Sequence, residues 1–333
     1  MPSRRTFFAA GLSALTEPAW AAEDYAAALS RAYGGPVSPA QAQRRLWLAA
    51  NAARNRADVL LRGQGLAAGS VAERLRTLAA DPRWLYPDDD AGRDRAVAAM
   101  NARLAAIRPR LRLAFGDLPI AAAEVRRMSR PDEAAGRGGY RQPPSDKSPG
   151  LYFIDLAHIR ARPAWTLPSV AFHEVTPGHL LQIPLEAAAC PPPARVKASG
   201  AYSEAWATYA EQLAADLGAY AADPLGEIGY LQWRLFRLAR AIADIGLHAE
   251  GWTRERAVAE VTALQGFPIA FVTIEADVTR IAGNPGKVAA EALGALALAS
   301  WRPRDRTRWP GFHKAVLATG PWPFRELERR LRG

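Results

Sequence analysis

The sequence predicts a mainly α-helical protein that carries a small β-sheet. Apolar residues recur at i, i+3 and i+4 spacing over most of 24–116 and again over most of 168–300, which is the period of amphipathic helices. Only two short stretches, 120–128 and 151–156, have the composition of strands. The chain has 333 residues, of which 49% are hydrophobic, so it is long enough to bury a large core.

The expected elements follow in order along the chain. In the first helical region, Gly and Pro interrupt the pattern near residues 34–36, 63–70 and 87–90. A loop rich in Gly and Pro, residues 130–150, separates the two candidate strands. Further helices are expected over 168–185, 196–218, 224–249, 253–264, 273–281 and 285–300. With no internal repeat or long linker, residues 23–333 are expected to form one helix-rich domain.

Residues 1–22 have the pattern of an export signal. Two arginines, Arg4 and Arg5, precede a short apolar run and an Ala19-Trp20-Ala21 cleavage pattern. Ser-Arg-Arg-Thr-Phe-Phe also resembles a twin-arginine signal, which predicts export of the folded protein to the periplasm. The alternative is an amphipathic N-terminal helix. Nothing after this segment has the roughly 18 apolar residues of a membrane span.

Charge and cysteine content exclude several classes of protein. The net charge is +10, but only four of the 43 basic residues are lysine and no nucleic-acid-binding motif accompanies them, so no nucleic-acid partner is expected. The single cysteine, Cys190, rules out an internal disulfide and a CxxC zinc knuckle. The sequence does not indicate the oligomeric state.

Candidate metal ligands lie in His173-Glu174-Val175-Thr176-Pro177-Gly178-His179. Zinc hydrolases use imidazoles and a carboxylate as ligands and need a further carboxylate beside the attacking water. The two histidines are six residues apart, which on a regular helix places them about 240° apart. Because Pro177 and Gly178 can break or bulge a helix, His179 could still turn back toward His173. Otherwise the two histidines would be unrelated.

Glu204 is the candidate carboxylate ligand. It lies 25 residues after His179, on an expected second helix, with Glu211 close to the same face. A glutamate projecting from a neighbouring helix would complete a site of two histidines and one carboxylate. By itself, an isolated helical glutamate is more often exposed.

Together these blocks resemble the bacterial family called domain of unknown function 885. The resemblance covers roughly residues 40–298 and is carried by the loop from Tyr140 to Phe153 and by three motifs. The matching motif residues are His173, Glu174, Pro177, Gly178, His179, Leu181 and Gln182; Ser203, Glu204, Trp206, Ala207, Tyr209 and Glu211; and Asp244, Gly246, His248, Gly251 and Trp252. The resemblance implies a helical fold related to gluzincin-type zinc metallopeptidases, with the small sheet edging the cleft.

The resemblance also implies roles for individual residues. His173, His179 and Glu204 would bind Zn²⁺, and Glu174 would be the general base that activates zinc-bound water. Manganese or cobalt would suit the same ligands less well. The implied activity is cleavage of short peptides, although the same metal chemistry could hydrolyse another amide or an ester.

Other residues are candidates for supporting roles. Asp244 and His248 lie one helical turn apart, so His248 could stabilise an oxyanion with Asp244 orienting it, or it could support the metal ligands from behind. The alternative is an ordinary helix-surface hydrogen bond between the two. Arg240 and Arg280 could bind a substrate carboxylate. Tyr140 is a further substrate-binding candidate.

The chain also departs from the family pattern. It is shorter than typical members, and Leu180 stands where many members have another histidine. Ile281 and Glu291 stand where members tend to carry tyrosines. Zinc peptidases often use tyrosines to support the transition state. The alternative expectation is therefore a catalytically degenerate, helical peptide-binding protein that keeps the zinc site.

Overall fold

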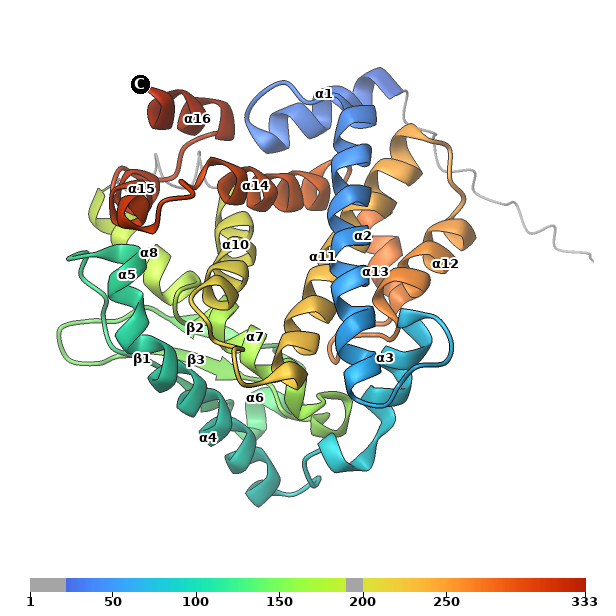
Figure 1. Ribbon diagram of the computed structural model, residues 1–333, viewed down its shortest axis with the longest axis vertical. Helices are drawn as coiled ribbons and strands as arrows, with labels where there is room; N and C mark the ends of the chain where they lie inside the picture. Colours follow the sequence, from blue (N-terminus) through green and yellow to red (C-terminus); the bar gives the residue numbers. More distant parts are fainter. Residues whose placement is uncertain (1–21, 190–199) are drawn as a thin grey trace, which may run out of the picture.

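The computed structural model describes residues 22–189 and 200–333, and this part of the chain is mainly helical, as the sequence predicts. Figure 1 shows the helices stacked around each other, with a small sheet on one side. The α-helices are α1 Ala22–Tyr33, α2 Pro39–Gly63, α3 Val71–Ala80, α4 Asp90–Ile107, α5 Leu111–Phe115, α6 Arg130–Ala134, α7 Leu167–Glu174, α8 His179–Ala189, α10 Tyr202–Asp216, α11 Pro224–Ala249, α12 Arg254–Gln265, α13 Ile274–Ala282, α14 Lys287–Trp301, α15 Trp309–Leu317 and α16 Phe324–Arg332.

Helix α11 is the central element of the fold. It packs along α2 and also contacts α7, α12, α13 and α14, and Figure 1 shows α2 and α11 side by side. Helix α14 in turn packs on α10 and α1. A helix covered on several sides needs apolar residues around most of its circumference, and most residues of α11 are indeed buried. This arrangement fixes α11 beside α7 and α10, the helices that carry the candidate ligands.

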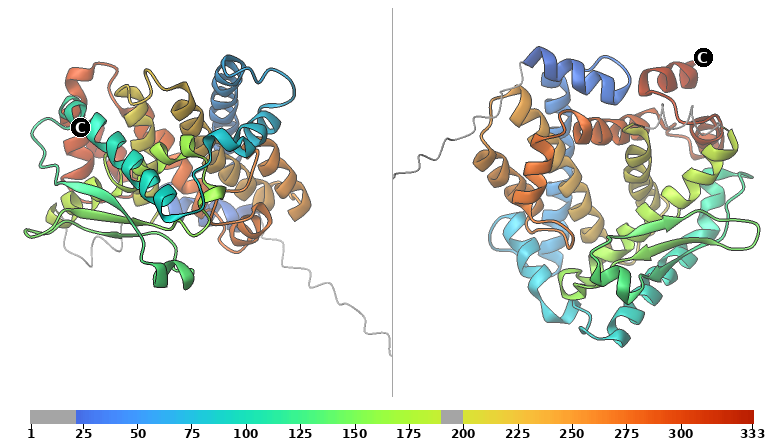
Figure 2. Two further views of the ribbon diagram at one scale, coloured as in Figure 1. Left: turned by 90° about the horizontal axis from the view of Figure 1, so that it is seen from below. Right: turned by 180° about the vertical axis from the view of Figure 1, so that it is seen from behind.

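The sheet has three strands in the order β1-β3-β2. Strands β1 (Ala123–Arg127) and β3 (Gly150–Ile154) are parallel, and β2 (Tyr140–Gln142) pairs antiparallel with β3. Helix α4 packs against β1, where Asn101 accepts from the Val125 amide at 2.8 Å and donates to its carbonyl at 2.9 Å. The view from behind in Figure 2 shows the strands in front of α4.

The structure confirms two predicted strands and corrects two details. Strand β2 lies inside 130–150, which the sequence predicts as loop, because three residues among glycines and prolines carry no strand pattern of their own. The helix expected over 168–185 is split into α7 and α8. The export-signal prediction falls on residues outside the described part, apart from Ala22.

Apolar side chains from α1 to α16 join one buried core, which includes Tyr25, Trp206 and Leu327. This core therefore runs from the first described helix to the last. No helix in residues 22–189 or 200–333 combines the length and apolar composition needed to cross a bilayer, in line with the sequence.

Candidate metal centre

A tight turn between α7 and α8 brings the two histidines together. Helix α7 ends at Glu174 and α8 begins at His179, so the expected interruption at Pro177 and Gly178 is confirmed. A Cβ at Gly178 would lie 1.8 Å from the carbonyl oxygen of His173, so only glycine permits this approach. The indole of Trp206, on α10, donates to the Pro177 carbonyl at 3.1 Å and ties the turn to the neighbouring helix.

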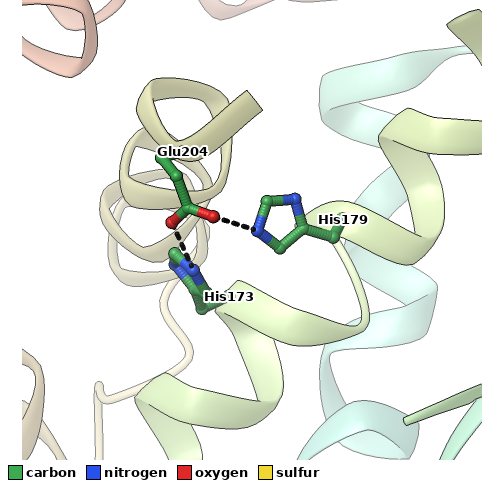
Figure 3. Close-up of side chains that lie close together, drawn as sticks. All are labelled: His173, His179 and Glu204. Atoms are coloured by element: carbon green, nitrogen blue, oxygen red, sulfur yellow. Dashed lines mark ion pairs between the residues drawn. The ribbon is translucent and has the colours of Figure 1, made fainter. Parts of the chain in front are cut away.

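His173, His179 and Glu204 converge on one point. Figure 3 shows Glu204 reaching from α10 toward the imidazoles at the end of α7 and the start of α8. His173 Nε2 lies 3.4 Å from Glu204 Oε2, and His179 Nε2 lies 3.4 Å from Glu204 Oε1. The candidate ligand atoms of all three side chains lie within 4.8 Å of one another.

The three side chains lie close enough together to hold one metal ion. Zinc bonds of about 2.0–2.1 Å at tetrahedral angles place neighbouring ligand atoms roughly 3.3 Å apart. Each imidazole lies 3.4 Å from one of the two Glu204 oxygens, which is close to that spacing, and one ligand atom from each of the three side chains falls within 4.8 Å of the others. His179 Nε2 is also buried without a hydrogen-bond partner in the described residues. Such an atom loses solvation unless something else binds it, and a metal ion would do so.

A buried carboxylate orients His173. Glu211 lies two helical turns beyond Glu204 on α10. Its Oε1 lies 2.9 Å from His173 Nδ1. In the tautomer with a proton on Nδ1, His173 donates to Glu211 and leaves Nε2 free for a ligand. Glu211 is held in turn by Ser169, which donates at 2.6 Å, and by Arg237, which donates at 2.7 Å.

His179 has a similar arrangement with neutral partners. Its Nδ1 lies 3.3 Å from Gln182 Oε1 and 3.3 Å from Ser203 Oγ. Gln182 donates its amide to Glu186 at 2.9 Å, so its oxygen is turned toward the imidazole. Both histidines therefore direct Nε2 toward Glu204. Sequence reasoning assigned no role to these partners, although Glu204 and Glu211 share a helix face.

Charges in the site already favour a cation. Burial would raise the pKa of Glu204, but its contacts with His173 and His179 outweigh burial and hold that pKa well below its usual value. Burial and Arg237 would lower the pKa of His173, yet Glu204 and Glu211 together raise it to about 9. Burial lowers the pKa of His179. The site thus favours the ionised form of Glu204, the neutral form of His179 and the positively charged form of His173.

Glu174 follows the first histidine directly and faces the same cleft. Its carboxylate pairs with Arg141 of β2, and its side chain is 17% exposed. The ion pair links the sheet to the end of α7. Sequence reasoning did not single out Arg141, which lies 33 residues before its partner.

The candidate ligands open onto a cleft of about 1000 Å³. His173, Glu174 and Glu204 line one part of it, and the other walls come from α11, α13, the segment 268–273 and the sheet. Tyr152 of β3 contributes to the lining, so the sheet does edge the cleft. Trp233, Phe236 and Phe271 form an aromatic portion of the wall.

The three substrate-binding candidates separate into two groups. Arg240 and Arg280 both line the cleft and share Asp277, at 2.9 Å and 3.6 Å respectively. Tyr140 instead stacks on Phe153, with ring centroids 4.7 Å apart, and is not among the residues that line this cleft.

Asp244 and His248 do not reach the cleft. His248 Nδ1 lies 3.1 Å from Asp244 Oδ1, and His248 Nε2 lies 3.0 Å from the Ala282 carbonyl. Asp244, which is fully buried, accepts from the amides of Gly286 and Ala289. This placement argues against the expected oxyanion role, because His248 contacts the end of α13 and Asp244 the start of α14. The two residues match the family motif, but their contacts are those of a structural connection.

The positions that depart from the family pattern lie on α13 and α14. Ile281 is 2% exposed and belongs to the packed interior. Glu291 is half-buried on α14, where burial and the negative charge of Glu204 raise its pKa to about 7. A carboxyl group that titrates near neutrality thus replaces one expected tyrosine.

Residues 2–331 match the family described as "Bacterial protein of unknown function (DUF885)". The chain belongs to this family. No curated protein matches the chain.

Two solved structures are similar to this chain over 93% of its length. One is a "putative lipoprotein" from Colwellia psychrerythraea, with 31% sequence identity and a TM-score of 0.83. The other is a "putative lipoprotein of unknown function" from Shewanella oneidensis, with 15% identity and a TM-score of 0.76, which shows a shared fold. The chain covers 55% of the first protein and 59% of the second, so it spans little more than half of either.

Proposed function

We propose that this DUF885 chain is a zinc-dependent metallopeptidase that cleaves short peptides, related in its site to the gluzincin type. The convergence of His173, His179 and Glu204, with candidate ligand atoms within 4.8 Å of one another, carries the proposal. Two histidines and a glutamate are a ligand set that leaves a fourth position for water or substrate. Bound zinc would supply Lewis acidity and lower the pKa of a coordinated water.

The chain's own residues would divide the remaining work. Glu174 lies at the mouth of the site and would accept a proton from the attacking water and pass it to the leaving amine. Arg141, its ion-pair partner, holds the carboxylate in place. Glu211 and Gln182 keep the two imidazoles oriented. The aromatic wall of the cleft would pack against peptide side chains and exclude water.

We further propose that the protein works outside the cytoplasm, in the periplasm. The N-terminal pattern of Arg4, Arg5 and the Ala19-Trp20-Ala21 site supports export by a twin-arginine route. The description of both structural neighbours as "putative lipoprotein" agrees with an exported family.

Replacement of Glu174 tests the catalytic assignment. Glu174→Gln preserves the side-chain shape but removes the proton acceptor, so zinc content should be unchanged and peptide hydrolysis should fall by about 10²-fold to 10⁴-fold. Exposed Glu275 on α13 provides the control variant Glu275→Gln, which should keep full activity. Hydrolysis by Glu174→Gln at the wild-type rate would show that Glu174 is not the base.

A second candidate is a peptide-binding protein that has lost turnover. Ile281 and Glu291, which replace the tyrosines expected from the family, favour it. Restoring both, as Ile281→Tyr with Glu291→Tyr, would create hydrolysis in an inactive chain if this candidate is correct. Hydrolysis by the unaltered chain would exclude it.

A further inference from the structure

Arg162 is a buried arginine on the wall of the cleft. It follows β3 and directly precedes Pro163, and its side chain joins Tyr152 and Val170 in lining the cleft. It is 9% exposed. Within residues 22–189 and 200–333, its guanidinium has no ion pair, side-chain hydrogen bond or cation–π contact. Burial without such a partner lowers the pKa of Arg162.

The other arginines of the cleft wall differ from Arg162 in having carboxylate partners. Arg237 pairs with Glu211 at 2.7 Å, and Arg240 pairs with Asp277 at 2.9 Å. Arg280 shares Asp277 and is 58% exposed on its side chain. These guanidinium groups are therefore satisfied by the protein or by solvent, whereas Arg162 is neither paired nor well solvated.

The carboxylate whose charge acts on Arg162 forms no ion pair with it. Asp155 also lines the cleft and its charge acts on Arg162, but no ion pair within 4.0 Å joins them. Asp155 Oδ1 instead accepts from the Ala157 amide at 2.9 Å, which fixes its position in the loop after β3. A buried cation without a partner is costly, and proteins keep one where a ligand supplies the counter-charge.

We infer that Arg162 binds a carboxylate of the substrate, so the cleft selects acidic peptides or peptide C-termini. A guanidinium can form two parallel hydrogen bonds to one carboxylate, which gives orientation as well as affinity. Because Arg162, His173 and Glu204 line the same cleft, a peptide held by Arg162 lies in the cleft that Glu174 also lines. The inference rests on the proposed function in taking the ligand to be a peptide.

Binding of three acetylated oligoalanine peptides tests this inference. The first has a free C-terminal carboxylate, the second is amidated and carries one aspartate, and the third is amidated and has no carboxylate. Calorimetry on the full chain with Glu174→Gln and zinc supplied avoids turnover. We expect tighter binding of the first or second peptide than of the third, and the preferred one identifies the source of the carboxylate.

Arg162→Met removes the charge and keeps a similar side-chain stem. It should weaken binding of the preferred peptide by about 10-fold to 100-fold and leave the uncharged peptide unaffected. Arg160→Met is the matched control, since Arg160 lies two residues away, is exposed and does not line the cleft. It should bind all three peptides as the parent does.

Thermal stability separates a binding role from a structural one. Because Arg162 has no internal partner, Arg162→Met should have a melting temperature equal to or above that of its parent. A lower melting temperature with equal weakening for all three peptides would overturn the inference, as would unchanged binding of the preferred peptide. A chain that binds as expected but never hydrolyses peptides would contradict the proposed function and leave the role of Arg162 standing.

Discussion

His173 Nδ1 and Glu211 Oε1 lie 2.9 Å apart in a contact that is buried on both sides. Glu211 comes from α10, as Glu204 does, so one helix supplies both a candidate ligand and the group that orients another ligand. The same glutamate is anchored by Ser169 and Arg237. The candidate centre is therefore built into the packing of α7, α10 and α11.

Loss of this contact should weaken metal binding without removing a ligand. Glu211→Gln retains a polar group at the position but removes the charge that favours His173 as a donor through Nδ1, so zinc affinity should fall by about 10-fold to 100-fold. Competition with a chromophoric chelator measures the affinity. The control is Glu227→Gln on α11, which removes a surface ion pair with Arg56 and should bind zinc normally. Equal affinity for the two variants would show that Glu211 does not support the centre.

The turn between the histidines should tolerate no side chain at Gly178. Gly178→Ala places a Cβ 1.8 Å from the carbonyl oxygen of His173, so the turn must open. We expect a loss of about 3 kcal/mol in the free energy of unfolding, with weaker zinc binding. Gly311→Ala is the control because a Cβ there meets nothing within 4 Å, and alanine favours its helix by about 1 kcal/mol. Denaturant titration of both variants provides the comparison; similar stabilities would contradict the geometry of the turn.

Glu291 should make the metal-free protein less stable as the pH rises. Its pKa is about 7 in the folded chain and 4.5 in the unfolded reference, so between these values the folded chain holds the extra proton. Stability is then full below about pH 4.5 and falls by up to roughly 3 kcal/mol as the pH rises to about 7.

Melting temperatures across this pH range, with a chelator present, test the effect. Glu291→Gln cannot ionise and should lose much of the decline, whereas the exposed control Glu275→Gln should keep it. A decline of the same size in Glu291→Gln as in wild type would assign the pH dependence to other groups.

The sequence predicted the helices well because their signal is local. The i, i+3, i+4 pattern and residues such as Ser38, which accepts from the Gln41 amide at the start of α2, depend on near neighbours. Strand β2 was missed because it is only three residues long and is defined by its pairing with β3. Pairing of that kind arises from tertiary structure.

The candidate site was predictable where its residues carry a motif. His173, His179 and Glu204 meet as their spacing and the break at Pro177-Gly178 suggested. Arg141 and Arg162 were missed because the fold alone brings Arg141 to Glu174 and Arg162 to the cleft wall, and one arginine among 39 carries no local signal. Asp244 and His248 were predicted to act in the site, but they do not line the cleft. Their i, i+4 spacing is what a helix-to-helix connection also requires.

The metal content of the purified protein tests the central claim most directly. Mass spectrometry should find about one zinc per chain in the wild type and in Glu174→Gln, and little in His173→Ala, His179→Ala or Glu204→Ala. Circular dichroism of each variant would confirm that the fold persists. If the wild-type chain takes up no zinc even when zinc is supplied, or if the folded ligand variants retain it, then His173, His179 and Glu204 are not a zinc site.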